Sequence, residues 1–331
     1  MRHRLLVALG IGLAGLTTLA LSQSPPPDTF SIREAVPADD VVHPGSYTEW
    51  WYVNIVNPTT KETFIVTFNS APIHTTSSFF YDKFGNKSHL IGPNSSFTFT
   101  GAPSVCSTAG CLVYHASSNQ WHLNYAANGV TADIWLKNPR RGVTSGPLNY
   151  EGQTMSWTNP VATSVTSGWF WPANAPGPIS VNGWRGYHDH NWGNFDLSNQ
   201  NYAGWEWAGS HEPNGGAKVM GGVIDGQGHW HGTIVDVDPA LGTRYCRSQS
   251  TLAANALELS DWAVIDDFEY PRKVVTRCTT GSSLPVQTYT VTSPHKVLGF
   301  LFEFTESIGK TGTPGSAALI EHFRTYAYAG S

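Results

Sequence analysis

The chain has 331 residues, enough for one large β domain or two of ordinary size, so chain length sets no limit on the core. Its net charge is −5 and it contains no run of basic residues, which excludes the usual signature of a nucleic-acid-binding protein. The 13 tryptophans, 13 tyrosines and 15 phenylalanines indicate either a large apolar cavity or a surface that stacks on carbohydrate.

The N-terminus carries the pattern of an export signal. Arg2 and Arg4 precede an apolar run that ends at Leu21, with small residues before the expected cleavage point. No later run in the sequence has the length of a transmembrane helix, so we predict a secreted protein without a stable membrane span. Residues 1–22 are assigned as a signal peptide, with a retained anchor as the alternative, and residues 23–46 as an extended leader.

From residue 47 onward, apolar and polar residues alternate with a period of two, which is typical of β-strands. In EWWYVNIVN, for example, Glu49, Trp51 and Val53 share one face, and many similar short runs follow between Gly, Asn, Ser and Pro turns. The best helical candidate is the stretch 250–259. The sequence therefore predicts an all-β fold of barrel or sandwich type.

A proline-rich passage, WFWPANAPGPISVNG, interrupts the strand pattern at residues 169–183. We interpret it as the linker between two β domains, because the same alternation resumes after it. The predicted boundaries are 47–175 for the N-terminal domain and 176–331 for the C-terminal domain.

Four cysteines fit a chain that passes through an oxidising compartment. Three pairings are formally possible, and we expect the two local ones: Cys106–Cys111 and Cys246–Cys278. Two sequons, at Asn86 and Asn94, would be glycosylated in a eukaryotic host.

The stretch YHDHNW carries the densest set of chemically active side chains. On a strand, His188, His190 and Trp192 share one face, while Tyr187 and Asp189 lie on the other. His-x-His on a strand is a spacing that metal ligands use. Hydrogen-bonded structural histidines are the alternative, and the sequence assigns no metal.

A second His-x-His, formed by His229 and His231, occurs in the later stretch HWH. A third metal ligand has no clear signature for either pair, although three carboxylates are available: Glu206, Asp225 and Asp236. The pattern alone is therefore a weak indication of a cupin-like metal site.

Carboxylates near tryptophans support two other kinds of chemistry. Asp189, Glu206 and Asp225 occur in a region that also contains Trp205, Trp207 and Trp230. Paired acids beside sugar-stacking rings would fit a glycoside hydrolase. Buried acids with raised pKa values could instead protonate an alkene, whose cation the tryptophan faces would stabilise until water adds. Nucleophilic catalysis has little support, because the sequence contains no G-x-S-x-G elbow.

Together, GYHDHNWG, the upstream EWWYVN and the later GWEWA resemble the hydroxyneurosporene synthase (carotenoid 1,2-hydratase) and AttH-like family, which includes the secreted fungal kievitone hydratase. This family is related to the fungal lipocalin-like Diels–Alderases. The resemblance extends over most of the mature chain. It implies two consecutive lipocalin-like β-barrel domains that act on prenyl or polyene substrates without a metal or an organic cofactor.

The resemblance also implies roles for individual residues. The segment implicated in the activity of the carotenoid hydratases matches Asp189, His190, Asn191 and Trp192. The aspartate of a later Tyr-x-Asp motif matches Asp225, but Val223 stands at the position of the tyrosine. The absence of this tyrosine favours a reaction that depends less on any single acidic residue, as in the Diels–Alderases.

The sequence hypothesis is a secreted, cofactor-independent enzyme that adds water to the alkene of a hydrophobic prenylated or polyene secondary metabolite. The candidate catalytic residues are His190, Asp225, Asp189 and Trp192. The candidate substrate-binding residues are Glu49, Trp51, Tyr187, His188, Trp205, Glu206 and Trp207. The alternatives are a Diels–Alderase that closes a ring in a polyene, and a non-catalytic lipocalin-like carrier of an apolar ligand. For each residue, a structural role in the core is the competing interpretation.

Overall fold

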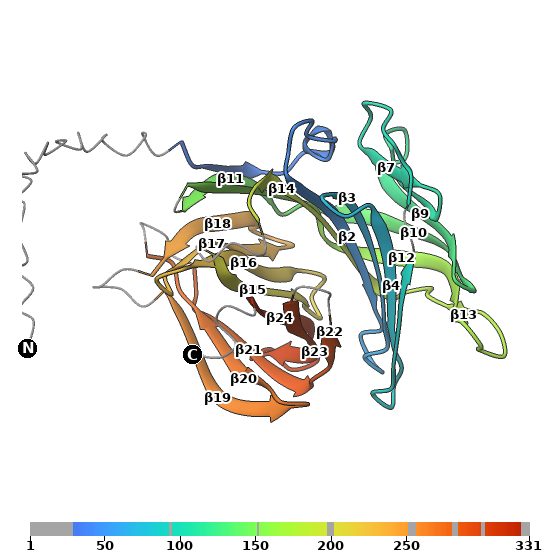
Figure 1. Cartoon of the computed structure of the whole chain (residues 1–331). Helices are drawn as coiled ribbons and strands as arrows, with labels where there is room; N and C mark the ends of the chain where they lie inside the picture. Colours follow the sequence, from blue (N-terminus) through green and yellow to red (C-terminus); the bar gives the residue numbers. More distant parts are fainter. Residues whose placement is uncertain are drawn as a thin grey trace, which may run out of the picture.

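The computed structural model describes residues 29–92, 95–150, 152–196, 202–250, 256–279, 284–298 and 302–325. The predicted signal peptide, the first part of the leader and the sequon at Asn94 lie outside these ranges. The described residues are almost entirely β, with one short 3-10 helix, η1 (Pro37–Asp39), ahead of the main strands. Two curled antiparallel sheets, each a lipocalin-like half-barrel, make up the part of the molecule that the structure describes (Figure 1), which confirms the predicted all-β class.

The first sheet contains fourteen strands among the described residues. They are β1 (Ser31–Glu34), β2 (Thr48–Val56), β3 (Thr63–Ala71), β4 (Thr75–Tyr81), β5 (Lys87–Gly92), β6 (Phe97–Thr98), β7 (Ser104–Ser107), β8 (Gly110–His115), β9 (Gln120–Ala127), β10 (Val130–Arg140), β11 (Val143–Tyr150), β12 (Gln153–Trp171), β13 (Ile179–Ser180) and β14 (Arg185–Asn194). Their order is β5-β4-β3-β2-β14-β12-β10-β9-β8-β7-β6, with β11 and β13 also paired to β12, and β1 paired to β11.

The second sheet contains ten strands among the described residues. They are β15 (Tyr202–His211), β16 (Ala217–Asp225), β17 (Trp230–Asp238), β18 (Gly242–Gln249), β19 (Leu257–Ile265), β20 (Phe268–Thr276), β21 (Gln287–Ser293), β22 (Lys296–Leu298), β23 (Phe302–Thr311) and β24 (Ala317–Thr325). Their order is β18-β17-β16-β15-β24-β23-β21-β20-β19, with β22 paired to β23.

After the proline-rich passage the chain returns to the first sheet, because β14 pairs with both β2 and β12. There it fills the space between two strands whose facing edges would otherwise lack hydrogen-bond partners. The change of sheet therefore falls between Asn194 and Tyr202, beyond the expected boundary at 175/176. The predicted helix at 250–259 is wrong for the part of this stretch that the structure describes, because strand β19 begins at Leu257.

Strand β2 contributes to two hydrophobic layers. Trp51, Val53 and Ile55 pack inside the first sheet, whereas Tyr52 and Val56 pack in a layer shared with the second sheet. This double burial explains why EWWYVNIVN is largely apolar on both faces while keeping the side-chain alternation of a strand. The contact between the sheets thus begins at the same strand that supplies part of the candidate site.

Both predicted disulfides are confirmed. Cys106 and Cys111 face each other across the β7–β8 hairpin, and Cys246 of β18 is bonded to Cys278, which follows β20. Since β18 and β19 are the two ends of the second sheet and β20 is next to β19, the second disulfide links opposite ends of the curled sheet. Asn86 lies exposed in the β4–β5 turn and donates a hydrogen bond to Asp82; its glycosylation stays a prediction.

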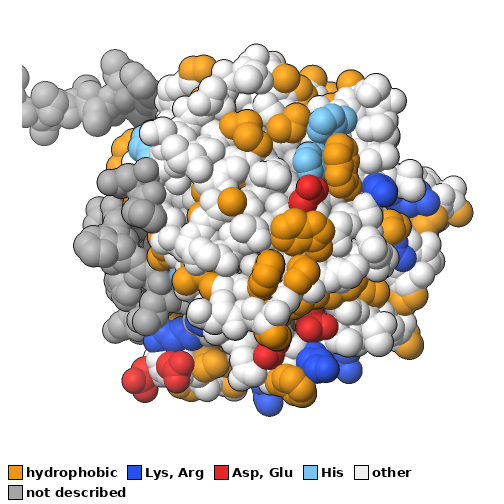
Figure 2. Space-filling model, turned by 90° about the vertical axis from the view of Figure 1, so that its right-hand side faces the viewer, with side chains coloured by type: hydrophobic (Ala, Val, Ile, Leu, Met, Phe, Trp, Pro, Cys, Tyr) orange, Lys and Arg blue, Asp and Glu red, His pale blue; other side chains and the backbone are white. Residues whose placement is uncertain are grey.

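The surface carries few charges. On the face shown in Figure 2, hydrophobic side chains form several patches among uncharged polar atoms, with only scattered charged groups. Large exposed hydrophobic residues include Trp169, Trp171 and Trp262. In the part of the chain that the structure describes, no helix has the length and apolar character needed to cross a membrane.

Candidate active site

Strand β14 places the YHDHNW stretch between two environments, as its period of two predicts. His188 and His190 face the interior of the first sheet, where they meet Trp51 and other core residues. Tyr187 and Asp189 face the second sheet. The candidate residues of this strand therefore belong to two separate groups.

A buried carboxylate, Asp40, joins the two histidines. Its Oδ2 atom lies 2.9 Å from Nε2 of His188, and its Oδ1 atom lies 3.2 Å from Nδ1 of His190. Burial by itself would raise the pKa of Asp40, but the charges and hydrogen bonds of His188 and His190 together outweigh it, so the pKa is lowered. Asp40 is therefore an ionised carboxylate that fixes the orientation of both rings.

Glu49 continues this chain toward His43. Its Oε1 atom lies 3.1 Å from Nε2 of His190 and accepts a hydrogen bond of 2.7 Å from the backbone N–H of His43. The ring Nδ1 of His43 lies 3.4 Å from the same oxygen. Ser70 Oγ donates to Oε2 of Glu49 at 3.1 Å. One carboxylate oxygen is thus shared by two imidazoles.

The charges in this group favour a proton on His190. Burial lowers the pKa of His190, but its contacts with Asp40 and Glu49 more than offset this effect, and the pKa is raised. Burial raises the pKa of Glu49, yet its hydrogen bond with His190 and its contacts with His43 lower it to about 2. The arrangement places the His190 ring between two carboxylates, which favour its protonated form.

Aromatic rings enclose the chain and lead to a pocket. Trp51 stacks on His190 with ring centroids 4.0 Å apart, and His43 stacks on Trp192 at 3.8 Å. His43 is the most accessible of the group, with a side chain that is 29% exposed. Trp192 also borders a pocket of about 240 Å³. The pocket is lined by Pro44, Gly45, Ser46, Thr154, Ser156, Trp192, Gly193 and Asn194.

Asp189 lies on the opposite face of β14, in a network between the sheets. Its Oδ2 atom accepts hydrogen bonds from Tyr187 at 2.6 Å and from Trp157 at 3.0 Å, and Trp207 donates to the Tyr187 hydroxyl at 3.2 Å. Burial raises the pKa of Asp189 to about 6 despite these donors. Asp189 thus has the raised pKa that the alkene hypothesis requires, but its side chain is enclosed by packed aromatic residues.

Two further carboxylates, which the sequence did not single out, share this layer. Glu306 of β23 accepts hydrogen bonds from Tyr81 at 2.6 Å and Tyr52 at 3.1 Å, and burial raises its pKa to about 7. It pairs across the sheet with Glu321 of β24, which accepts from Trp205 at 2.9 Å. Burial and the neighbouring Glu306 raise the pKa of Glu321. Neither strand carries a motif that marks these acids.

Asp225 lies at the end of β16, in a third environment. Its Oδ2 atom lies 2.8 Å from Nε2 of His231 and 3.6 Å from Nδ1 of His229, and its Oδ1 atom accepts two backbone hydrogen bonds. Burial opposes them, but these donors lower the pKa of Asp225. Val223, which stands at the tyrosine position of the Tyr-x-Asp motif, is buried in an apolar cluster with Tyr150. These contacts favour a carboxylate rather than a protonated acid at Asp225.

Glu206 occupies a fourth environment, inside the second sheet. Its Oε1 atom lies 2.6 Å from Nδ1 of His322 and 2.8 Å from Arg324. Asp189, Glu206 and Asp225 therefore have three separate sets of partners, and nothing in their contacts pairs them as glycosidase acids.

The metal hypothesis from His-x-His takes a different form in the structure. Both nitrogens of His188 are engaged, with Asp40 and with the carbonyl oxygen of Tyr52. Within the described residues, the group whose ligand atoms all lie within 4.8 Å of one another is His43, Glu49 and His190. His190 is therefore in a group suited to a metal ion, but His188 is not.

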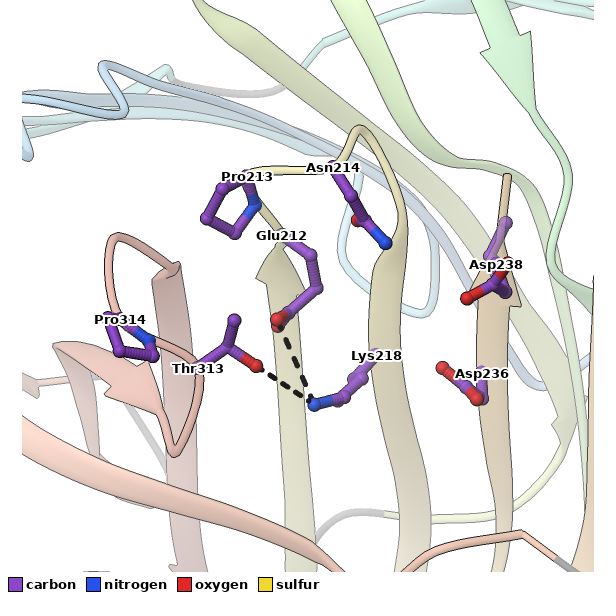
Figure 3. Close-up of a pocket in the computed structure, with 9 residues that line it drawn as sticks. Glu212, Pro213, Asn214, Lys218, Asp236, Asp238, Thr313 and Pro314 are labelled. Atoms are coloured by element: carbon purple, nitrogen blue, oxygen red, sulfur yellow. Dashed lines mark hydrogen bonds and ion pairs between the residues drawn. The ribbon is translucent and has the colours of Figure 1, made fainter. Parts of the chain in front are cut away.

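A larger pocket, of about 360 Å³, lies at the turn between β15 and β16, where Glu212, Lys218 and Thr313 approach one another (Figure 3). The Lys218 Nζ atom lies 3.8 Å from Glu212 and 3.3 Å from Thr313. None of the candidate residues from the sequence lines this pocket. Four of its lining residues carry an ionisable group, namely Glu212, Lys218, Asp236 and Asp238, and none is aromatic, so it suits an apolar substrate poorly.

No protein-family model and no curated protein matches the sequence. Solved structures do match the fold. An AttH-type protein from Nitrosomonas europaea is similar with a TM-score of 0.58 and 14% identity, over 88% of this chain and 96% of its own. Kievitone hydratase from Nectria haematococca is similar with a TM-score of 0.55 and 12% identity, over 87% of this chain and 94% of its own. The chain therefore has the fold of these two proteins.

Proposed function

We propose that this chain is a secreted hydratase-type enzyme that adds water across a carbon–carbon double bond of a small hydrophobic molecule. The observation that carries the proposal is the chain of acid–base groups from the buried Asp40 to the partly exposed His43, which ends beside the pocket that Trp192 borders. The fold shared with kievitone hydratase supports the reaction class. The two disulfides support passage through an oxidising compartment.

The first step is the transfer of a proton to one alkene carbon. His190 and His43 both direct a ring nitrogen toward the same oxygen of Glu49, so a proton on His190 can reach His43 through that carboxylate. His43 delivers the proton from the edge of the pocket, because its side chain is the most exposed of the three. The electron pair of the double bond forms the new carbon–hydrogen bond, and the other carbon becomes a cation.

The second step is the capture of the cation by water. Trp192 borders the pocket, and the ionised Glu49 lies behind His43, so the ring face and the carboxylate would both stabilise the positive charge. Thr154 and Ser156 line the pocket with hydroxyl groups that can position a water molecule. Once the carbon–oxygen bond forms, the oxygen loses a proton to His43, so the substrate has gained one water and the enzyme has recovered its proton.

The proposal is tested by incubating the purified mature protein with prenylated phenolics and with linear polyenes, and by analysing the products by mass spectrometry. A product heavier than the substrate by one water, formed in proportion to active protein, supports it. An isomer of unchanged mass would instead indicate the Diels–Alderase alternative. Tight binding without any product would indicate a carrier, since the same pocket could serve either task.

A further inference from the structure

We propose that His43, Glu49 and His190 form a binding site for a divalent transition-metal ion of the zinc type. Oε1 of Glu49 lies 3.1 Å from Nε2 of His190 and 3.4 Å from Nδ1 of His43. In a tetrahedral site with metal–ligand bonds of about 2.1 Å, neighbouring ligand atoms lie about 3.4 Å apart. Both distances to Glu49 therefore already suit such a site, and all three ligand atoms lie within 4.8 Å of one another, whether or not the chain is a hydratase.

The contact between His43 and Glu49 supports the same site. Nδ1 of His43 is buried and lies 3.4 Å from Oε1 of Glu49, but among the described residues neither this contact nor any other meets the geometry of a hydrogen bond to that nitrogen. A buried polar atom without a partner is costly, and a metal ion at this point would accept its lone pair. The same ion would also bind the adjacent Oε1 atom of Glu49, so that both atoms would be metal ligands.

The surroundings of His190 match those of a metal-binding histidine. Its Nδ1 atom lies 3.2 Å from Oδ1 of the fully buried Asp40, while its Nε2 atom is directed at Glu49. A carboxylate on the far nitrogen orients the ring and makes it a better ligand. Asp40 is itself held by His188, so this outer support is fixed in place.

The kind of ion follows from the ligands. Two imidazoles and one carboxylate suit zinc, cobalt or another transition metal, whereas calcium and magnesium prefer sites made of oxygen atoms. Three protein ligands leave a position free for water, and the partly exposed His43, stacked on Trp192, places the group near the pocket. An ion bound here would occupy the lone pairs that carry the proton in the proposed reaction, so metal binding and hydration would be mutually exclusive.

The test is a titration of untagged protein, first freed of metal with a chelator and dialysed, with Co²⁺ and Zn²⁺ at neutral pH. Binding is followed by Co²⁺ absorption in the visible range and by calorimetry. We expect one ion per chain and a loss of affinity of about 100-fold or more in His43→Ala and Glu49→Gln. His122→Ala is the matched control, because His122 pairs with Asp133 elsewhere in the first sheet, and it should bind as the wild type does.

Far-ultraviolet circular dichroism checks that each variant is folded, and His43→Ala removes a side chain that is already 29% exposed. Absence of stoichiometric binding to the wild type would overturn the proposal, as would unchanged affinity in folded His43→Ala. Because the readout is binding, a protein that turns over no substrate would still give a result. Conversely, absence of metal binding would leave the hydratase proposal standing.

Discussion

Replacing Glu306 with glutamine tests whether a protonated carboxylic acid lies between the two sheets. Glu306 is 2% exposed, accepts hydrogen bonds from Tyr52 and Tyr81 of the first sheet, and has a pKa that burial raises to about 7. Its neighbour Glu321 adds a second carboxyl group, so the loss of a proton would bring two negative charges together. Glutamine keeps the size of the side chain and cannot ionise.

The expected effect has a definite sign. Because the folded-state pKa of Glu306 lies above the value in the unfolded chain, its stabilising contribution is complete below pH 4.5 and is lost as the pH rises through 7. A shift from 4.5 to about 7 corresponds to about 3 kcal/mol in the free energy of unfolding, most of it, roughly 2 to 3 kcal/mol, lost between pH 5 and pH 8. The Glu306→Gln variant should lack this part of the pH dependence.

The measurement is urea unfolding, followed by tryptophan fluorescence, at pH 5 and pH 8. The wild type should lose stability between the two pH values by roughly 2 to 3 kcal/mol more than Glu306→Gln does. Glu269→Gln is the control, since Glu269 is exposed on β20, and its pH dependence should equal that of the wild type. Equal losses in the wild type and Glu306→Gln would refute the reasoning.

Two other predictions concern stability, and each is checked by thermal unfolding. In Gly232→Ala the new methyl group would lie 2.2 Å from the ring of Trp230, so we expect a loss of about 1–3 kcal/mol, whereas Gly177→Ala meets no atom within 4 Å and should melt as the wild type does. In Cys246→Ser the loss of the disulfide to Cys278, a sequence separation of 32, should cost about 3–4 kcal/mol; an unchanged melting temperature would contradict the view that this bond holds the ends of the second sheet together.

The sequence predicted the strands and the two faces of the YHDHNW stretch because both depend on local alternation. It did not predict Asp40 and His43, which lie in the segment expected to be an extended leader and reach His188 and His190 across more than a hundred residues of sequence. No local pattern encodes such a contact. The candidate catalytic residues therefore lie in different sheets: His190 is in the first sheet and Asp225 is in the second.

The acids between the sheets were missed for a related reason. Glu306 and Glu321 occur singly in otherwise ordinary strands, and their environment exists only once Tyr52 and Tyr81 of the first sheet pack against them. The change of sheet does not coincide with the proline-rich passage, because proline-rich composition indicates a break in a strand, not a change of sheet. After that break, strand β14 rejoins the first sheet, and its position there is known only from its pairing with β2.

The most direct test of the central claim compares product formation by the wild type, Glu49→Gln and Asp225→Asn, on a substrate to which the wild type adds water. Glu49 connects the two histidines of the proposed proton path, so its glutamine variant should lose activity by about 100-fold or more while remaining folded. Asp225→Asn, which alters a separate cluster with His231, should retain most of the activity. Full activity in Glu49→Gln would contradict the account. A comparable loss of activity in folded Asp225→Asn would also contradict it, and would indicate that the catalytic acid lies in the second sheet.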